Sequence, residues 1–589
     1  MDETDYIIVG AGSAGCVLAE RLSASGRHRV TVLEAGGSDR RFFVHLPLGY
    51  GKLFYDPSVN WLYKTEPDAG LNGARDHWPR GRVLGGSSSI NAMVYIRGHR
   101  ADYEEWGVNP GWGWPECLSA YKAMEDTEAG GDAWRGAGGP LFVSANRTGL
   151  HPLVSDYLAA CASAGLAENA DFNGAEQEGA GVYQMTIKGG RRNSAARAFL
   201  RPAMRRANVR VVTGAMVSRV VIEDGRAVGV EYRRGGEACV LRAKAEVILA
   251  GGAINSPQLL QLSGVGPGAL LQGLGIPVVR DNANVGDHLS DHQGINYTWA
   301  MTVPTYNDEL RPWWGKLRAG MQYVLTRGGP LSKSINHAGG FFRTSPDLPR
   351  PNMQLYFQAF STLIPREGER PVLDPDPWSG MSIGLSNCRP TSRGHIRLRS
   401  ADPMVHPAIT ANAFSTNHDV EEMLAAVKYL RHLAAQPPLA RLIRQELRPG
   451  PEVASDEALI DDFRNWTQWS PWENIDPTLK RTYSGAPQGS GAIYHWEGND
   501  KVGSGRMEIT HATAPSKVIL RLEFIKPFAA VNTTEFTVTP RGAGSTVSWA
   551  MYGPASFMHK FMSTLFNLNA MLAKQFDQGL TNLKAAAEK

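Results

Sequence analysis

Three glycines near the N-terminus are spaced as in loops that bind the pyrophosphate of a dinucleotide. Gly10, Gly12 and Gly15 form the pattern GxGxxG directly after the apolar run from Tyr6 to Val9. In such a loop the first glycine makes a tight turn, the second lets backbone amides approach the phosphates, and the third lets a helix pack on a strand. The N-terminus of that helix adds partial positive charge. The spacing therefore predicts a phosphate-binding loop.

The elements around this loop support the same prediction. The loop leads into the helix-compatible segment CVLAERLSAS, and a second strand, RVTVL at residues 29–33, ends at Glu34, 19 residues after Gly15. A carboxylate there can accept hydrogen bonds from a ribose. A tight turn without a nucleotide is the alternative, because a chain with 64 glycines contains some GxGxxG patterns by chance. The motif alone does not separate NAD from FAD.

Two longer stretches indicate which dinucleotide is bound. GRVLGGSSSINAMVYIRG (81–98) and GAINSPQLLQLSGVG (252–266) resemble the two signatures of the glucose–methanol–choline (GMC) oxidoreductases, which bind FAD. The resemblance covers residues 1–464 and implies an α/β fold, with a Rossmann-like FAD-binding domain and a sheet-based substrate domain. Three further segments resemble landmarks of the family: RRNSAARAFLRPA (191–203), NVGDHLSDH (284–292) and GHIRLRSADP (394–403).

The resemblance assigns the FAD site residue by residue. Glu34 is expected to hold the adenosine ribose and Val217 to contact the adenine. Ile90 stands where some family members carry the histidine that binds FAD covalently, so the resemblance implies non-covalent FAD here. The other expected contacts are Gly10, Gly12, Ser13, Ala14 and Gly15 of the first loop, and Val83, Gly86, Ser87, Asn91, Ala92, Met93 and Val94 of the second.

The family's catalytic motif does not follow where the resemblance predicts it. Family members oxidise an alcohol by passing hydride to the flavin, while a histidine in a YHPxGT-like motif takes the hydroxyl proton. A second His or Asn and a final strand of the FAD sheet come later. After Arg464 this chain continues NWTQWSPWE, and no such motif follows. Because a lost general base costs about 10²- to 10⁴-fold in rate, weak or absent activity is expected.

No other histidine replaces the missing one in the sequence. His495, in AIYHW, lacks the Pro-x-Gly-Thr continuation and lies in a strand-like alternation, where a lone histidine is more simply structural. His288, His292 and His337 match no catalytic position of the family. No catalytic residue is therefore assigned.

From residue 465 onward the sequence pattern changes and predicts a different fold. Six short strand-like segments separated by Gly, Asn or Pro turns precede an amphipathic helix expected from about Ala555. With WxxWSPW and GSGRMEI, this order resembles the START-like (SRPBCC, polyketide-cyclase-like) superfamily, a helix-grip α+β fold. Such domains commonly hold an apolar ligand between sheet and helix. The alternative is that Trp549, Met551, Phe561 and Phe566 only fill a core.

Both parts are expected to be truncated where they join. The START-like family begins with a strand and a short helix, but residues 457–463 here resemble a helix of the oxidoreductase. The expected domains are FAD-binding (1–300), substrate domain with the start of the C-terminal GMC part (301–464), and START-like (465–589). A recombination or assembly error explains this junction more simply than a designed bifunctional enzyme. The alternatives to alcohol oxidation are an apolar-ligand binder with a relic flavin domain, and a non-functional fusion.

Composition excludes several other classes of function. A net charge of +4 over 589 residues, without a long Lys/Arg run, argues against a nucleic-acid-binding surface. Five scattered cysteines without a CxxC pair argue against a disulfide framework and against a zinc or other metal site. The acidic N-terminus is no signal peptide, and no uncharged run is long enough to span a membrane, so a soluble cytoplasmic protein is expected. The sequence leaves the alcohol substrate, the electron acceptor and the oligomeric state open.

Overall fold

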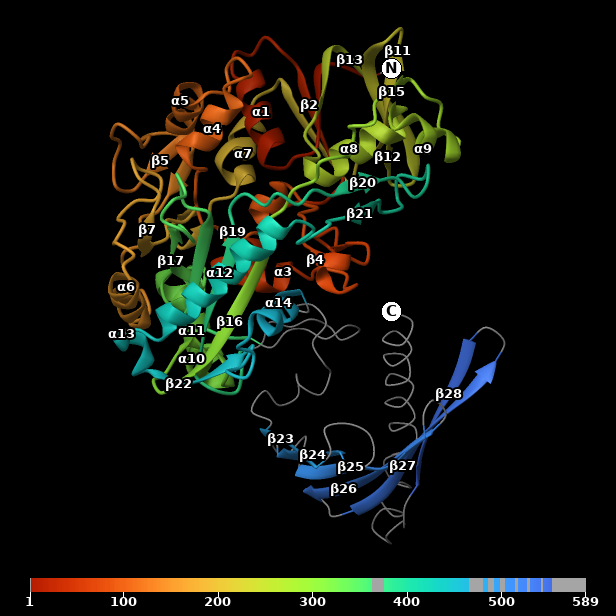
Figure 1. Cartoon of the computed structure of the whole chain (residues 1–589). Helices are drawn as coiled ribbons and strands as arrows, with labels where there is room; N and C mark the ends of the chain where they lie inside the picture. The colour runs from red at the N-terminus through yellow and green to blue at the C-terminus, as the bar shows by residue number, and fades with distance from the viewer. Residues whose placement is uncertain are drawn as a thin grey trace. The chain divides into compact units, whose positions relative to one another are not determined.

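The computed structural model describes residues 2–362 and 375–464, and six strands between residues 480 and 552. The chain forms two compact units, Met1–Gln468 and Trp469–Lys589, and each contains sheets of its own (Figure 1). Within the described ranges, no helix is long and apolar enough to cross a membrane. The same ranges hold no group of three or more His, Cys, Asp or Glu side chains that could bind a metal ion.

The first sheet of unit 1 is the predicted Rossmann-like layer. Its strand order is β10-β2-β1-β13-β12-β11; the first four strands are parallel neighbours, and β11 and β12 form an antiparallel hairpin. All five residues of β2 are buried, as is typical of a parallel strand covered on both faces. The strands are β1 (Asp2–Val9), β2 (Val30–Glu34), β10 (Val209–Thr213), β11 (Met216–Glu223), β12 (Arg226–Arg234) and β13 (Glu237–Leu249).

Two glycine-rich segments leave this sheet side by side. Helix α1 (Ser13–Ser23) follows β1, and α8 (Gly252–Leu262) follows β13, the parallel neighbour of β1. The backbone N–H of Ala250 donates to the carbonyl of Val9 at 2.8 Å, so the two strands end level with each other. Ligands of open α/β sheets bind beyond the carboxyl ends of such strands.

The far edge of β13 is partly open. Residues 243–249 pair with β1 on one side, and no strand among the described residues pairs with their other edge. Lys244, Ala245 and Glu246 on this stretch are exposed. A lysine on a free edge discourages pairing with another chain.

A second sheet of unit 1 is antiparallel and largely buried. Its order is β22-β16-β19-β18-β17-β7, and every residue of β19 is buried. Helices α6 (Leu153–Ser163) and α12 (Asn417–Ala434) contribute side chains to the largest apolar core, which also contains side chains of this sheet. The strands are β7 (Gly179–Val182), β16 (Gly294–Met301), β17 (Asn336–Phe342), β18 (Met353–Gln358), β19 (Gly380–Asn387) and β22 (Ile443–Arg448).

Helix α14 (Asp456–Arg464) belongs to unit 1. Leu459 is 2% exposed in the same core, and the Nδ2 amide of Asn72 donates to Asp461 at 3.2 Å. The helix at the junction therefore folds as part of unit 1.

One carboxyl group of α14 predicts a pH-dependent stability. Burial raises the pKa of Asp462 from 3.8 to about 7; Arg431 opposes the shift, whereas Glu446 and Asp461 add to it. Between about pH 4 and pH 7 the folded state keeps a proton that the unfolded chain has lost, so the free energy of unfolding falls as pH rises through this range. Asp462→Asn is expected to raise the melting temperature over wild type at pH 8 and to leave it nearly unchanged at pH 4. A benefit that is larger at pH 4 than at pH 8 would contradict this.

Unit 2 contains the predicted meander. Six antiparallel strands lie in sequence order, β23 to β28, each paired with the next. His495 lies within β24, between Thr482 on one neighbour and Arg506 on the other, which fits a structural role. The helix expected from about Ala555, with Phe561 and Phe566, lies outside the described residues. The strands are β23 (Lys480–Gly485), β24 (Ala492–Glu497), β25 (Ser504–Thr513), β26 (Lys517–Lys526), β27 (Ala530–Arg541) and β28 (Gly544–Tyr552).

Candidate active site

The first glycine loop has the geometry of a phosphate-binding turn. Gly10 has a φ of +102°, and a Cβ on Gly15 would lie 1.9 Å from the carbonyl oxygen of Gly10. Both positions therefore require glycine for the fold itself. A Cβ on Gly12, in contrast, would meet nothing closer than the carbonyl oxygen of Ala250 at 3.9 Å. Gly12 is the N-cap of α1 and supplies no side-chain cap, which leaves the first amides of the helix open to an anion.

The second glycine-rich loop packs directly on the first. The backbone N–H of Gly85 donates to the carbonyl of Ala11 at 2.8 Å, and a Cβ on Gly86 would lie 2.7 Å from the Cα of Gly12. The two loops therefore meet backbone to backbone and form one cradle. Three predicted contacts, Ser13, Ala14 and Ser87, are exposed around it.

Glu34 closes the cradle at the end of β2. Its carboxylate accepts backbone N–H groups from Ala11 and Gly36, both at 2.8 Å. Burial raises the pKa of this carboxyl group, and the two amides oppose the shift. Each oxygen keeps a second lone pair that can accept a ribose hydroxyl. Val217 lies near, because Ala215 donates its N–H to the carbonyl of Glu34, and the Val217 side chain is 7% exposed.

Asn91 is held in one orientation by two donors. Its Oδ1 atom accepts the Nη1 of Arg192 at 2.7 Å and the backbone N–H of Met93 at 3.1 Å. Because both partners donate hydrogen bonds, the side-chain atom that they contact must be the oxygen of the amide. The Nδ2 group of Asn91 is then the donor that remains for a ligand. Met93 adopts a φ of +64°, a conformation seldom taken by side chains of its kind.

Arg192 was not predicted as a site residue from the sequence, although it lies in the family-like stretch 191–203. It is 1% exposed and donates to the carbonyls of Val44 (2.9 Å) and Ser88 (3.1 Å) as well as to Asn91. Burial lowers the pKa of its guanidinium to about 9. Its buried Nη2 has no partner in the described part of the chain. The arginine thus brings a buried positive charge under the second loop.

We expect Asn91→Ala to weaken FAD binding about tenfold. The change removes one donor, worth about 0.5–1.5 kcal/mol, and leaves Arg192 without that acceptor. Titration of FAD into the flavin-free protein, followed by flavin fluorescence, measures the dissociation constant. Asn72→Ala, at a half-buried asparagine that bonds to Asp461, is the control and is expected to leave it unchanged.

The remaining predicted residues differ in what they can contact. The side chains of Val83 and Ile90 are 0% and 2% exposed and share an apolar cluster with Val44, so Val83 offers only its backbone to a cofactor. Ala92 and Val94 are half-buried.

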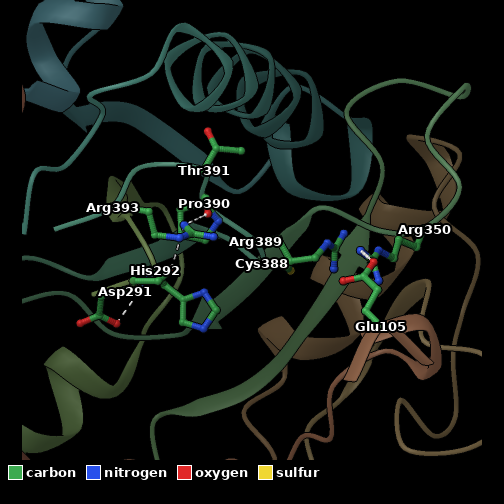
Figure 2. Close-up of a pocket in the computed structure, with 10 residues that line it drawn as sticks. Glu105, Asp291, His292, Arg350, Cys388, Arg389, Pro390, Thr391 and Arg393 are labelled. Carbon is green, nitrogen blue, oxygen red and sulfur yellow. Dashed lines mark hydrogen bonds and ion pairs between the residues drawn. The ribbon is translucent and has the colours of Figure 1, made fainter. Parts of the chain in front are cut away.

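A cavity of about 560 Å³ adjoins the second loop (Figure 2). At one side, Asp291 pairs with Arg80, next to the start of the loop segment, at 3.3 Å. At another, Cys388 packs against the same apolar cluster as Val94. Its lining residues are Glu105, Ser290, Asp291, His292, Arg350, Cys388, Arg389, Pro390, Thr391 and Arg393.

His292 lines this cavity and is oriented by a backbone atom. Its Nδ1 lies 2.6 Å from the backbone carbonyl oxygen of Asn387. A carbonyl only accepts, so Nδ1 carries a proton and donates it to this oxygen. This contact could not be predicted from sequence, because the partner of His292 is a backbone atom 95 residues away.

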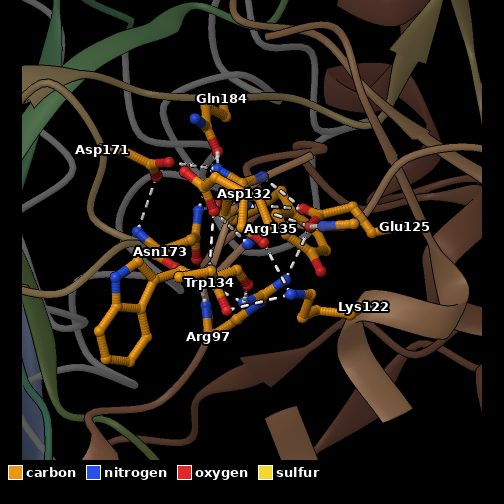
Figure 3. A network of polar contacts seen from close by, with 12 residues as sticks. Arg97, Lys122, Glu125, Asp132, Trp134, Arg135, Asp171, Asn173 and Gln184 are labelled. Atoms are coloured by element: carbon orange, nitrogen blue, oxygen red, sulfur yellow. Dashed lines mark hydrogen bonds and ion pairs between the residues drawn. The ribbon is translucent and has the colours of Figure 1, made fainter. Parts of the chain in front are cut away.

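A buried ion network anchors the end of the second loop segment (Figure 3). Glu125, 0% exposed, accepts Arg97 at 2.7 Å and also pairs with Arg135. Arg135 in turn donates to Asp171 at 2.6 Å and to Gln184 at 2.8 Å. The network holds residue 97 in place after the loop and keeps the loop's exit rigid.

Comparison with known proteins decides the family. The model of the N-terminal part of GMC oxidoreductases matches residues 4–294, and that of the C-terminal part matches residues 390–474. Human mitochondrial choline dehydrogenase is 42% identical over 477 residues, which cover 78% of this chain and 78% of that protein. The chain belongs to the GMC oxidoreductase family. It is accordingly an FAD-dependent oxidoreductase.

Other relatives of this GMC oxidoreductase give the same result. An alcohol dehydrogenase [acceptor] of Pseudomonas putida is 40% identical, over 78% of this chain and 83% of that protein. Among solved structures, pyridoxine 4-oxidase from Mesorbium loti superposes with a TM-score of 0.70 at 29% identity, over 78% of this chain and 86% of that one.

The C-terminal unit matches a different family. The model for polyketide cyclase / dehydrase and lipid transport proteins covers residues 457–588. It overlaps the GMC model over residues 457–474, which include α14. The two families are therefore alike in sequence at the junction.

Proposed function

We propose that this GMC oxidoreductase oxidises the CH–OH group of a small alcohol, with non-covalently bound FAD. The observation that carries the proposal is the meeting of Gly12 and Gly86, backbone to backbone, in a cradle closed by Glu34. Matches to choline dehydrogenases and to an alcohol dehydrogenase support the same substrate class.

The proposed cofactor contacts follow from the positions described above. Amides at the start of α1 would bind the pyrophosphate, Glu34 would accept the adenosine ribose, and the Nδ2 of Asn91 would donate to the ribityl or flavin portion. When bound, FAD supplies the acceptor for the hydride that leaves the carbinol carbon. The buried guanidinium of Arg192 favours an anionic neighbour because no carboxylate is among its described hydrogen-bond partners.

Turnover is expected to be slow compared with that of the relatives. The YHPxGT-like motif does not occur in the chain. Without that base, about 10²- to 10⁴-fold of rate is lost, equal to about 3–5 kcal/mol of barrier. Anaerobic mixing of the flavin-loaded protein with an alcohol panel tests the proposal. Bleaching of the flavin absorption by at least one alcohol is expected, and no bleaching by any of them would refute alcohol oxidation.

Non-covalent attachment has a separate test. Ile90 has no atom that can bond to the flavin, and its side chain lies in an apolar cluster. Acid precipitation is therefore expected to release all of the flavin into the supernatant. Yellow colour that stays with the protein pellet would show a covalent link.

A second candidate function concerns unit 2. The family match over residues 457–588 and the six-stranded meander favour binding of an apolar small molecule. A fluorescent fatty-acid probe should bind the full-length protein and should not bind a chain that ends before residue 466. Equal binding by both chains would remove this candidate.

A further inference from the structure

The cavity beside the second loop carries more positive than negative charge. Three arginines, Arg350, Arg389 and Arg393, line it together with two acids, Glu105 and Asp291. Asp291 is already paired with a fourth arginine outside the lining. Figure 2 shows Arg393 and His292 at one end and Arg350 and Glu105 at the other.

Two of the arginines are neutralised by helix α4 (Arg100–Trp106). Arg350 pairs with Asp102 at 2.9 Å and with Glu105, and Arg389 shares Asp102 at 3.6 Å. Their side chains are only 15% and 28% exposed. These two arginines are held in place at one side of the cavity, and Asp102 and Glu105 largely neutralise their charge.

Arg393 differs from them. Its Nη1 donates to neutral oxygens only: the carbonyls of Pro390 (2.6 Å) and Ser392 (2.9 Å) and the hydroxyl of Ser290 (3.4 Å). No carboxylate is among its partners in the part of the chain that the structure describes. A guanidinium fork held in place by two carbonyls and open on its other nitrogens matches a carboxylate or phosphate.

We propose that this cavity binds the alcohol substrate and that the substrate is an organic anion, a small hydroxy-carboxylate or hydroxyalkyl phosphate. The inference rests on the proposed function and names the substrate class. The oxyanion would pair with Arg393. The cavity's contacts with Arg80 and with the cluster around Val94 place the ligand beside the loop that would hold the flavin. An excess of positive charge disfavours a quaternary ammonium ligand in the same space.

In the proposed oxidation the O–H bond of the alcohol breaks with its proton passing to water, the C–H bond breaks with its hydride passing to FAD, and a C=O bond forms. The products are a carbonyl compound, reduced flavin and a proton released to water.

The test is calorimetric titration of the full-length, flavin-loaded protein at constant ionic strength. The probes are sodium glycolate, glycerol 3-phosphate, choline chloride and ethylene glycol. We expect at least one of the two anions to bind at least tenfold more tightly than choline or ethylene glycol, and the tighter of the two identifies the oxyanion. Arg393→Gln should weaken anion binding at least tenfold. Arg441→Gln, at a 67% exposed arginine paired with Asp156, is the control and should change it less than twofold.

Tighter binding of choline than of both anions, or unchanged anion binding by Arg393→Gln, would overturn the inference. Bleaching of the flavin by choline alone would overturn it and leave the proposed function standing. Anion binding without bleaching by any alcohol would support the anion site and overturn the proposed function.

Discussion

Gly12→Ala is expected to abolish tight FAD binding while the protein stays folded. The backbone of Gly12 is extended, with a φ of −74°, and an added Cβ would meet no protein atom closer than 3.9 Å. The methyl group would instead occupy the space through which a pyrophosphate approaches the amides of α1. We expect a loss of affinity of about 100-fold or more, which corresponds to roughly 2.7 kcal/mol. FAD titration and circular dichroism of the same sample measure affinity and fold.

Two other glycines sharpen this test. Gly15→Val would also lose flavin, but through the fold, because its Cβ would lie 1.9 Å from a backbone oxygen. Gly320→Ala, inside helix α11 (Trp313–Thr326) with no atom within 4 Å of the added Cβ, is the matched control. It should keep full FAD affinity and gain about 0.5–1 kcal/mol of stability. Wild-type affinity in Gly12→Ala would place the phosphates elsewhere.

Glu125→Ala is expected to destabilise unit 1 by about 3–5 kcal/mol. The substitution leaves Arg97 and Arg135, each 2% exposed, without the carboxylate between them, and breaking a buried ion pair by removing one partner costs this much. The loss is large against a typical domain stability of about 5–15 kcal/mol. Urea denaturation followed by tryptophan fluorescence measures it.

An exposed ion pair provides the comparison. Glu104 and Arg100 of α4 pair at 2.6 Å with side chains 51% and 61% exposed. Glu104→Ala should cost less than about 0.5 kcal/mol, because water already screens this pair. If the two substitutions had equal effects, the network around Glu125 would not be what fixes the exit of the second loop.

The sequence predicted what depends on local spacing. Gly10, Gly12 and Gly15 imply strand, turn and helix within a few residues, and the structure has β1, the turn and α1 at those positions. The strands of unit 2 were likewise predictable, because alternation and turn residues are local properties.

Contacts made by distant residues could not be predicted in the same way. Arg192 acts on Asn91 across 101 residues of sequence, and His292 is oriented by a backbone carbonyl of β19. The pattern of apolar and polar residues in a sequence does not show which backbone carbonyl will accept a hydrogen bond from a distant side chain. The charge of the cavity also depends on α4 neutralising Arg350 and Arg389 while leaving Arg393 with neutral partners, which only the folded arrangement reveals.

The junction between the two units lies in a stretch of sequence that the two families share, so the sequence alone does not show to which unit it belongs. Residues 457–474 match both families, yet α14 packs into the core of unit 1 through Leu459. We therefore propose that the functional boundary lies after Arg464, so that the oxidoreductase keeps this helix.

The central claim is that the two glycine loops hold FAD in this chain. The visible absorption spectrum of the purified full-length protein, recorded before and after incubation with excess FAD and desalting, tests it most directly. The account predicts flavin bands near stoichiometric intensity that survive desalting and are released by acid. A folded protein that stays colourless after incubation with FAD would contradict it and would mean that the cradle formed by Gly12, Gly86 and Glu34 no longer binds the cofactor.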